Sequence, residues 1–167
     1  MSVLNRTYYA SSGLVAVSGT SAVPALYVST PATADLVICK ILVAIESTSA
    51  QSASPSTNNS ILFTLNTVTG SVAGGAAVTP HQQPGASSLA ARSTWTSGST
   101  ALTGLTQSTD WWGQPIALSA GSWAAQDETN TGLEIAVPIS STLCFYYLAA
   151  SGAGSNLAAK IEAWFTE

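Results

Sequence analysis

Charged residues are scarce in this sequence. Of its 167 residues, 4 are Lys or Arg and 8 are Asp or Glu, which gives a formal net charge of −4. Four cations are too few for the basic stripe that releases counterions from a nucleic acid backbone, so the sequence predicts no nucleic acid partner. Low charge also weakens the repulsion that keeps monomers apart, and we therefore expect a homo-oligomer.

Residue types that carry catalysis or bind metals are equally few. The only histidine, His81, stands between two prolines, and no GxSxG motif accompanies the many serines. One histidine and two remote cysteines do not supply the three or four closely spaced ligands of a zinc site. The acidic residues Asp127, Glu128 and Glu134 lack the spacing of an EF-hand. The sequence therefore predicts that the protein is not an enzyme, with no catalytic residue, metal site or cofactor.

Long apolar runs are also missing. The longest, from Leu143 to Ala150, is far shorter than the roughly 20 residues of a spanning helix, so no membrane partner is expected. The start of the chain has one arginine followed by tyrosines and serines instead of an apolar signal segment, so export is not predicted. Cys39 and Cys144 are accordingly predicted to be buried thiols, and a disulfide between neighbouring strands is the alternative.

The sequence does contain the alternation that is typical of β-strands. In the run Leu36–Glu46, the odd-numbered residues from Val37 to Ile45 are apolar and share one face, which we predict to be the core face. In the run Leu157–Phe165, the odd-numbered residues from Ala159 onward predict a second core face. Lys160, Glu162 and Trp164 then lie on the opposite side.

Six further runs are bounded by Gly, Pro, Ser or Asn and predict strands: Leu14–Val17, Ala25–Ser29, Ile61–Val68, Gln114–Leu118, Leu133–Val137 and Leu143–Ala149. No crossover helices separate these eight strands, so a parallel sheet is disfavoured. The sequence predicts an all-β, antiparallel two-sheet β-sandwich resembling a jelly roll, in a single domain that spans residues 1–167.

Two stretches lack this alternation. Residues 47–59 read as a polar loop, and residues 70–113 form a long loop-rich segment. A structureless segment of the second length is uncommon inside a compact domain. We therefore expect weak strands around Ala76–Thr79 and Leu89–Trp95, together with one exposed loop.

Tryptophan is the most informative residue type. Adjacent residues of an extended chain point to opposite faces, so Trp111 and Trp112 can both be buried only between two layers. A tryptophan of this group can close the core, which we favour, anchor a subunit interface or stack on a sugar. Trp164 lies opposite the predicted core, and burial against another chain would explain it. The interface or ligand candidates are Trp95, Trp111, Trp112, Trp123 and Trp164.

Several stretches of this sequence, which is rich in Ala, Ser, Thr and Gly, form a specific pattern. They are TPHQQPGASSLAARSTWT at 79–96, followed by GLT at 104–106, then GQPIA at 113–117 and IEAWFTE at 161–167. In this layout the chain resembles small structural proteins of tailed bacteriophage virions. The resemblance implies a jelly-roll capsid decoration or accessory protein, often trimeric, and it carries over no catalytic residue.

The expected function is that of a non-enzymatic virion structural protein, a cement protein that binds the assembled shell and stabilises it by mass action. Its partners would be the major capsid protein or other virion proteins, and its location the virion, assembled in the host cytoplasm. The low charge departs from that of charged decoration proteins and leaves the tail open as a location. The alternative is a tail or vertex receptor-binding or carbohydrate-binding module, whose exposed tryptophans stack on a glycan.

Overall fold

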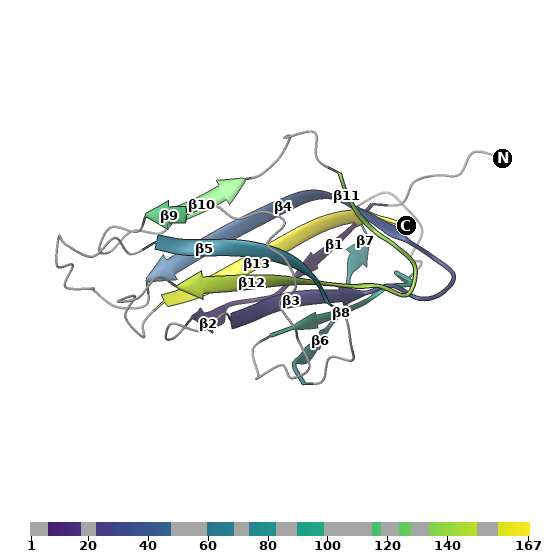
Figure 1. The fold of residues 1–167 in the computed structure, drawn as a ribbon, viewed down its shortest axis with the longest axis horizontal. Helices are drawn as coiled ribbons and strands as arrows, with labels where there is room; N and C mark the ends of the chain where they lie inside the picture. The colour runs from purple at the N-terminus through teal and green to yellow at the C-terminus, as the bar shows by residue number, and fades with distance from the viewer. Residues whose placement is uncertain are drawn as a thin grey trace.

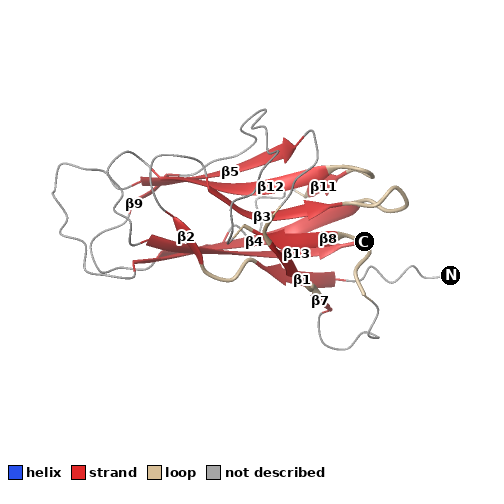
Figure 2. Ribbon diagram, turned by 90° about the horizontal axis from the view of Figure 1, so that it is seen from below, coloured by secondary structure: helices blue, strands red, loops and turns tan. Residues whose placement is uncertain are grey.

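The protein folds into two packed β-sheets. The structure is a computed structural model that describes residues 7–17, 23–47, 60–68, 74–82, 90–98, 115–117, 124–127, 134–149 and 157–167. These residues contain thirteen strands and no helix. The strands form two antiparallel sheets, which Figure 2 shows edge-on as two layers. The predicted all-β sandwich is thus confirmed.

The first sheet has the strand order β10-β4-β13-β1-β7, with β11 also paired to β4 and β2 to β13. Its strands are β1 (Thr7–Ser11), β2 (Val15–Val17), β4 (Leu36–Ser47), β7 (His81–Gln82), β10 (Ala124–Asp127), β11 (Ile135–Val137) and β13 (Leu157–Thr166). The second sheet has the order β6-β8-β3-β12-β5-β9. Its strands are β3 (Val23–Ser29), β5 (Ser60–Val68), β6 (Ala76–Val78), β8 (Thr94–Ser97), β9 (Pro115–Ala117) and β12 (Thr142–Ala149). The long strands β4, β13, β12 and β5 run along the longest dimension of the molecule (Figure 1).

All eight strands predicted from the sequence are present, with small shifts at their ends. The weak strands expected within residues 70–113 are also present, as β6 and, shifted toward Ser97, as β8. The strands β1, β7 and β10 were not predicted. Each is short, and each pairs with a strand of the first sheet that is remote in sequence: β13, β1 and β4, respectively. Such pairing depends on the partner and leaves little trace in local sequence.

Strand β13 follows its predicted alternation. Ile161, Ala163 and Phe165 are fully buried, whereas the even-numbered residues between Lys160 and Trp164 lie partly exposed on the other face. The strand pairs with β4 along nearly its whole length and with β1 and β2 on its other side. It is therefore the central strand of the sheet and fixes which residues of its neighbours face outward.

The predicted core face of β4 is correct at Ile41 and wrong at the start of the strand. Leu36 and Ile38 are buried, while Cys39 is exposed and Val37 is only partly buried. The cause is a β-bulge: Trp164 pairs with Lys40 and Phe165 with Ile38, so that Cys39 is an extra residue on β4. An extra residue reverses the alternation on one side of the bulge. The prediction of a buried thiol is thus wrong for Cys39 and correct for Cys144, and the two cysteines do not form a disulfide.

Strands β1 and β2 both pair with β13 on the side away from β4, and Ser12 lies between them. The backbone N–H of Ser12 donates to the carbonyl oxygen of Ile161 at 2.9 Å, and the N–H of Ile161 donates to Ser12 Oγ at 2.9 Å. The next residue, Gly13, has a φ of 67°, a left-handed conformation that favours glycine. Ser97 Oγ of β8 donates to the Ser12 carbonyl at 2.7 Å, which links the second sheet to this junction.

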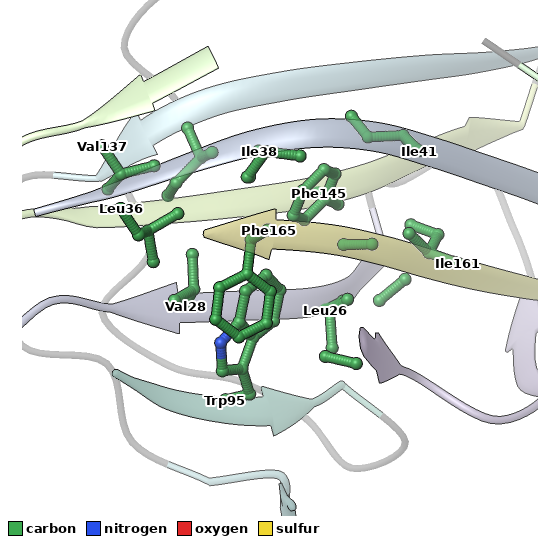
Figure 3. Close-up of a cluster of buried hydrophobic side chains, with 14 of the residues drawn as sticks. Leu26, Val28, Leu36, Ile38, Ile41, Trp95, Val137, Phe145, Ile161 and Phe165 are labelled. Atoms are coloured by element: carbon green, nitrogen blue, oxygen red, sulfur yellow. The ribbon is translucent and has the colours of Figure 1, made fainter. Parts of the chain in front are cut away.

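Aromatic rings from both sheets stack in the core. The ring centroids of Trp95 on β8 and Phe165 on β13 lie 4.7 Å apart, and those of Phe165 and Tyr8 on β1 lie 5.4 Å apart, with both pairs stacked. Figure 3 shows Trp95 and Phe165 among aliphatic side chains that include Leu26 and Ile38. Rings of this size bury a large apolar area, and they hold the two layers together.

A buried carboxylate borders this aromatic stack. The side chain of Glu167 is only 3% exposed and accepts backbone N–H bonds from Arg92 at 2.6 Å and from Ser93 at 2.9 Å. The hydroxyl of Ser93 also donates to Glu167 and accepts a bond from Trp95 Nε1 at 3.0 Å. Glu167, which follows β13, therefore holds Arg92 and Ser93 in place directly before β8.

Candidate functional site

One row of side chains crosses four strands on the outer face of the first sheet. In the antiparallel registers, Tyr9 lies opposite His81 on β7 and opposite Trp164 on β13, and Trp164 lies opposite Lys40 on β4. Directly opposed residues of antiparallel strands present their side chains on the same face. Odd-numbered neighbours of Trp164 are buried, so this face is the outer one. We call His81, Tyr9, Trp164 and Lys40 the outer row.

Three members of the outer row contact one another through their side chains. The ring centroids of Tyr9 and Trp164 lie 5.1 Å apart, with an angle of 53° between the ring planes. Lys40 Nζ lies 5.0 Å from the centroid of the Trp164 ring. A cation above a tryptophan ring contributes about 0.5–1 kcal/mol at an exposed site. Three of the four side chains are partly buried and His81 is exposed. The row is therefore an ordered surface in which Trp164 is held between a second ring and an ammonium group.

An ionic cluster lies next to the row on the same face. The hydroxyl of Tyr9 donates to Glu162 Oε1 at 2.6 Å, and Lys160 forms an ion pair with the same oxygen. Burial and the bond to Glu162 raise the pKa of Tyr9, and the bond to Glu162 raises the pKa of Lys160. Burial opposes ionisation of Glu162, but the hydrogen bonds from Lys160 and Tyr9 outweigh it and lower the pKa of this carboxyl group. At neutral pH Glu162 and Lys160 are thus charged and Tyr9 keeps its proton, and the bond to Glu162 fixes the orientation of Tyr9.

A groove of about 540 Å³ lies beside Tyr9. One wall is the junction of β1 and β2 from Ser11 to Leu14, and the other wall is β6 with Thr79. His81 and Ser97 also line the groove. The outer row and the groove therefore meet at Tyr9 and His81, and together they form the candidate site.

The tryptophans predicted as candidates fall into three groups. Trp95 is 2% exposed and belongs to the core, so the core interpretation applies to it and it is not a surface residue. Trp164 lies on the outer face as predicted, and it is part of the site. Trp111, Trp112 and Trp123 lie outside the described residues.

Sequence reasoning missed Tyr9 and Lys40 as partners of Trp164, and it assigned His81 to a loop. His81 begins β7 and is exposed. The alternation of Thr7–Ser11 was a signal for one outward tyrosine, because Tyr8 is buried and Tyr9 is not. Nothing local indicates that Tyr9 meets Glu162, since the two residues are 153 positions apart.

The described residues contain no group of three or more His, Cys, Asp or Glu side chains that could hold a metal ion. Among the same residues, no helix is long and apolar enough to cross a membrane. Comparisons with protein-family models, curated proteins and solved structures found no match. The assignment of a function therefore depends on the residues of this chain alone.

Proposed function

We propose that this protein is a non-enzymatic virion structural protein that binds the assembled shell, and that the outer row is its docking face. The single observation that carries the proposal is the ordered row of Tyr9, Trp164 and Lys40 on a sheet face that makes no contribution to the core. Tryptophan and tyrosine are the most common anchors of protein interfaces. The resemblance to tailed-phage structural proteins, which includes the stretch around Trp164, supports the same function.

The contacts of Trp164 favour a protein partner over a glycan. A sugar that stacks on tryptophan needs an open ring face, but here Tyr9 packs against the ring and Lys40 Nζ lies over it. Trp95, another ring in the glycan hypothesis, is buried. A protein partner can instead pack around the edge of such a preformed cluster, and little side-chain entropy is lost on binding.

The partners would be the major capsid protein and, within a trimer or another homo-oligomer, further copies of this chain. A protein that binds only the assembled lattice stabilises that lattice by mass action, with a gain that grows with its concentration over Kd. The scarcity of charged residues suits a surface that is covered in the particle. The protein would then be located in the virion.

The experiment is rebinding to particles from which this protein has been removed. We expect the unmodified chain to rebind, and Trp164→Ala and Lys40→Glu to bind at least roughly tenfold more weakly, which corresponds to about 1.4 kcal/mol. Tyr27→Ala is the matched control, because Tyr27 is partly exposed on β3 of the other sheet. Its affinity should stay within about twofold of the unmodified value.

Two results would contradict the proposal. The first is an unmodified chain that does not bind particles at all. The second is binding that survives both Trp164→Ala and Lys40→Glu, which would place the docking face elsewhere. Retention of the unmodified chain by immobilised glycans, with no binding to particles, would support the receptor-binding alternative instead.

A further inference from the structure

The groove exists because β7 separates from β1 after two residues. β7 pairs with β1 only at Tyr8 and Tyr9. The residue that would lie opposite Ala10 in the same register is Pro80, which has no N–H and cannot continue the ladder. The chain leaves the first sheet there, because the preceding strand β6 pairs with β8 in the second sheet. The two sheets diverge at this point, and the groove lies between β1 of the first sheet and β6 of the second.

Backbone hydrogen-bonding groups of β1 face this groove. The N–H of Ser12 donates toward β13, to the carbonyl of Ile161. In an antiparallel ladder successive residues direct their N–H and C=O groups to opposite sides, so those of Ser11 point away from β13 and toward the groove. Within the part of the chain that the structure describes, no strand pairs with Ser11 on that side. On the opposite wall, β6 is the last of the described strands in its sheet.

The lining of the groove defines the chemistry of its ligand. Among the described residues that line it, none is Lys, Arg, Asp or Glu. A phosphate group or an acidic peptide would therefore leave its charge uncompensated. The hydroxyl of Tyr9 is bonded to Glu162 and its ring packs on Trp164, so neighbouring residues already engage the aromatic ring of the groove. An unpaired strand edge beside small and apolar side chains is instead what an extended peptide recognises.

We propose that the groove binds an extended, uncharged segment of the shell protein, which adds as a strand to β1 at Ser11 and passes between Leu14 and Ala77. This inference rests on the proposed function and names a second contact within the same docking site. Main-chain bonds to Ser11 provide affinity, and the uncharged walls select against charged residues in the bound segment. Because the groove and the outer row meet at Tyr9, one partner can contact both.

The test introduces a charge into the groove without disturbing the core. Leu14 is 60% exposed and Ala77 is also exposed, so Leu14→Lys and Ala77→Lys should fold. Ile139→Lys is the matched control, because Ile139 is 54% exposed and does not line the groove. Each variant is assayed for rebinding to depleted particles and for binding to overlapping 15-residue peptides that cover the shell protein. Circular dichroism confirms that each variant is folded.

We expect at least one uncharged peptide to bind the unmodified protein and to slow hydrogen exchange at the Ser11 amide. Leu14→Lys and Ala77→Lys should weaken both peptide and particle binding at least tenfold, and Ile139→Lys should change neither. Normal particle binding by both groove variants would overturn this inference and leave the proposed function intact. An unmodified protein that fails to bind particles would overturn both. If the groove variants changed only the oligomeric state, the occupant would be a second copy of this chain, which also overturns the inference.

Discussion

The hydroxyl of Tyr9 donates to Glu162 Oε1 at 2.6 Å, and this bond joins β1 to β13 across the face that we propose as the docking surface. It fixes a tyrosine ring against Trp164, and Lys160 forms an ion pair with the same oxygen of Glu162. The orientation of the outer row is therefore determined before any partner arrives.

Replacement of Tyr9 by Phe should lower the free energy of unfolding by about 1.5 kcal/mol, because it removes a hydrogen bond to a charged group and keeps the ring. Denaturant unfolding measures this change. Tyr27→Phe is the control and should have a smaller effect, because the cluster of Glu162 and Lys160 does not include Tyr27. Equal stability of Tyr9→Phe and the unmodified protein would show that the bond does not stabilise the fold.

The ionic cluster predicts a stability plateau between about pH 5 and about pH 9. The folded-state pKa of Glu162 is lowered, so its contribution is present above the ordinary pKa of glutamate and is lost as the pH falls through the lowered value. The folded-state pKa values of Lys160 and Tyr9 are raised, so their contributions are complete below the ordinary values and are lost as the pH rises through the raised ones.

Thermal unfolding from pH 3 to pH 11 checks this plateau, with Glu162→Gln as the comparison. The difference in Tm between the unmodified protein and the variant should be largest on the plateau and should shrink toward acid pH. A difference that stayed constant across this range would mean that ionisation of Glu162 does not contribute to stability.

Glu167→Ala should destabilise the protein by about 2 kcal/mol. The substitution removes the acceptor of two backbone N–H bonds and one hydroxyl bond at a buried position, and bonds to a charged group contribute about 1.5–3 kcal/mol. Glu134→Ala is the matched control, because Glu134 is exposed, and its effect should stay within about 0.5 kcal/mol. Equal effects of the two substitutions would refute a structural role for the Glu167 carboxylate.

Gln82→Met should stabilise the protein by about 1 kcal/mol. The side-chain Nε2 and Oε1 atoms of Gln82 are buried and have no hydrogen-bond partner among the described residues. An unsatisfied buried polar group costs about 1–3 kcal/mol, and methionine has a similar length without that cost. A lower Tm for Gln82→Met would indicate that a bridging water satisfies the amide.

The sequence predicts those strands in which apolar and polar residues alternate along the strand itself. The two faces of β13 are predicted correctly from Lys160 to Phe165, where partly exposed and buried residues alternate without interruption. The prediction fails on β4, where the bulge at Cys39 reverses the alternation in a run that is apolar on both faces. A run of that kind holds no local information about where a bulge lies.

The candidate site could be predicted only in part. The outward position of Trp164 follows from the spacing of β13, but its contacts with Tyr9 and Lys40 depend on the strand order β4-β13-β1. Strand order is set by non-local packing and cannot be deduced from local alternation. The burial of Trp95 likewise depends on its position opposite Phe165, a residue of the other sheet.

The most direct test of a shell-binding virion protein is its copy number relative to the major shell protein in purified particles. We expect hundreds of copies per particle, as for a protein that covers the shell. A handful of copies would place it at the tail or a vertex, and complete absence from particles would contradict the virion function itself.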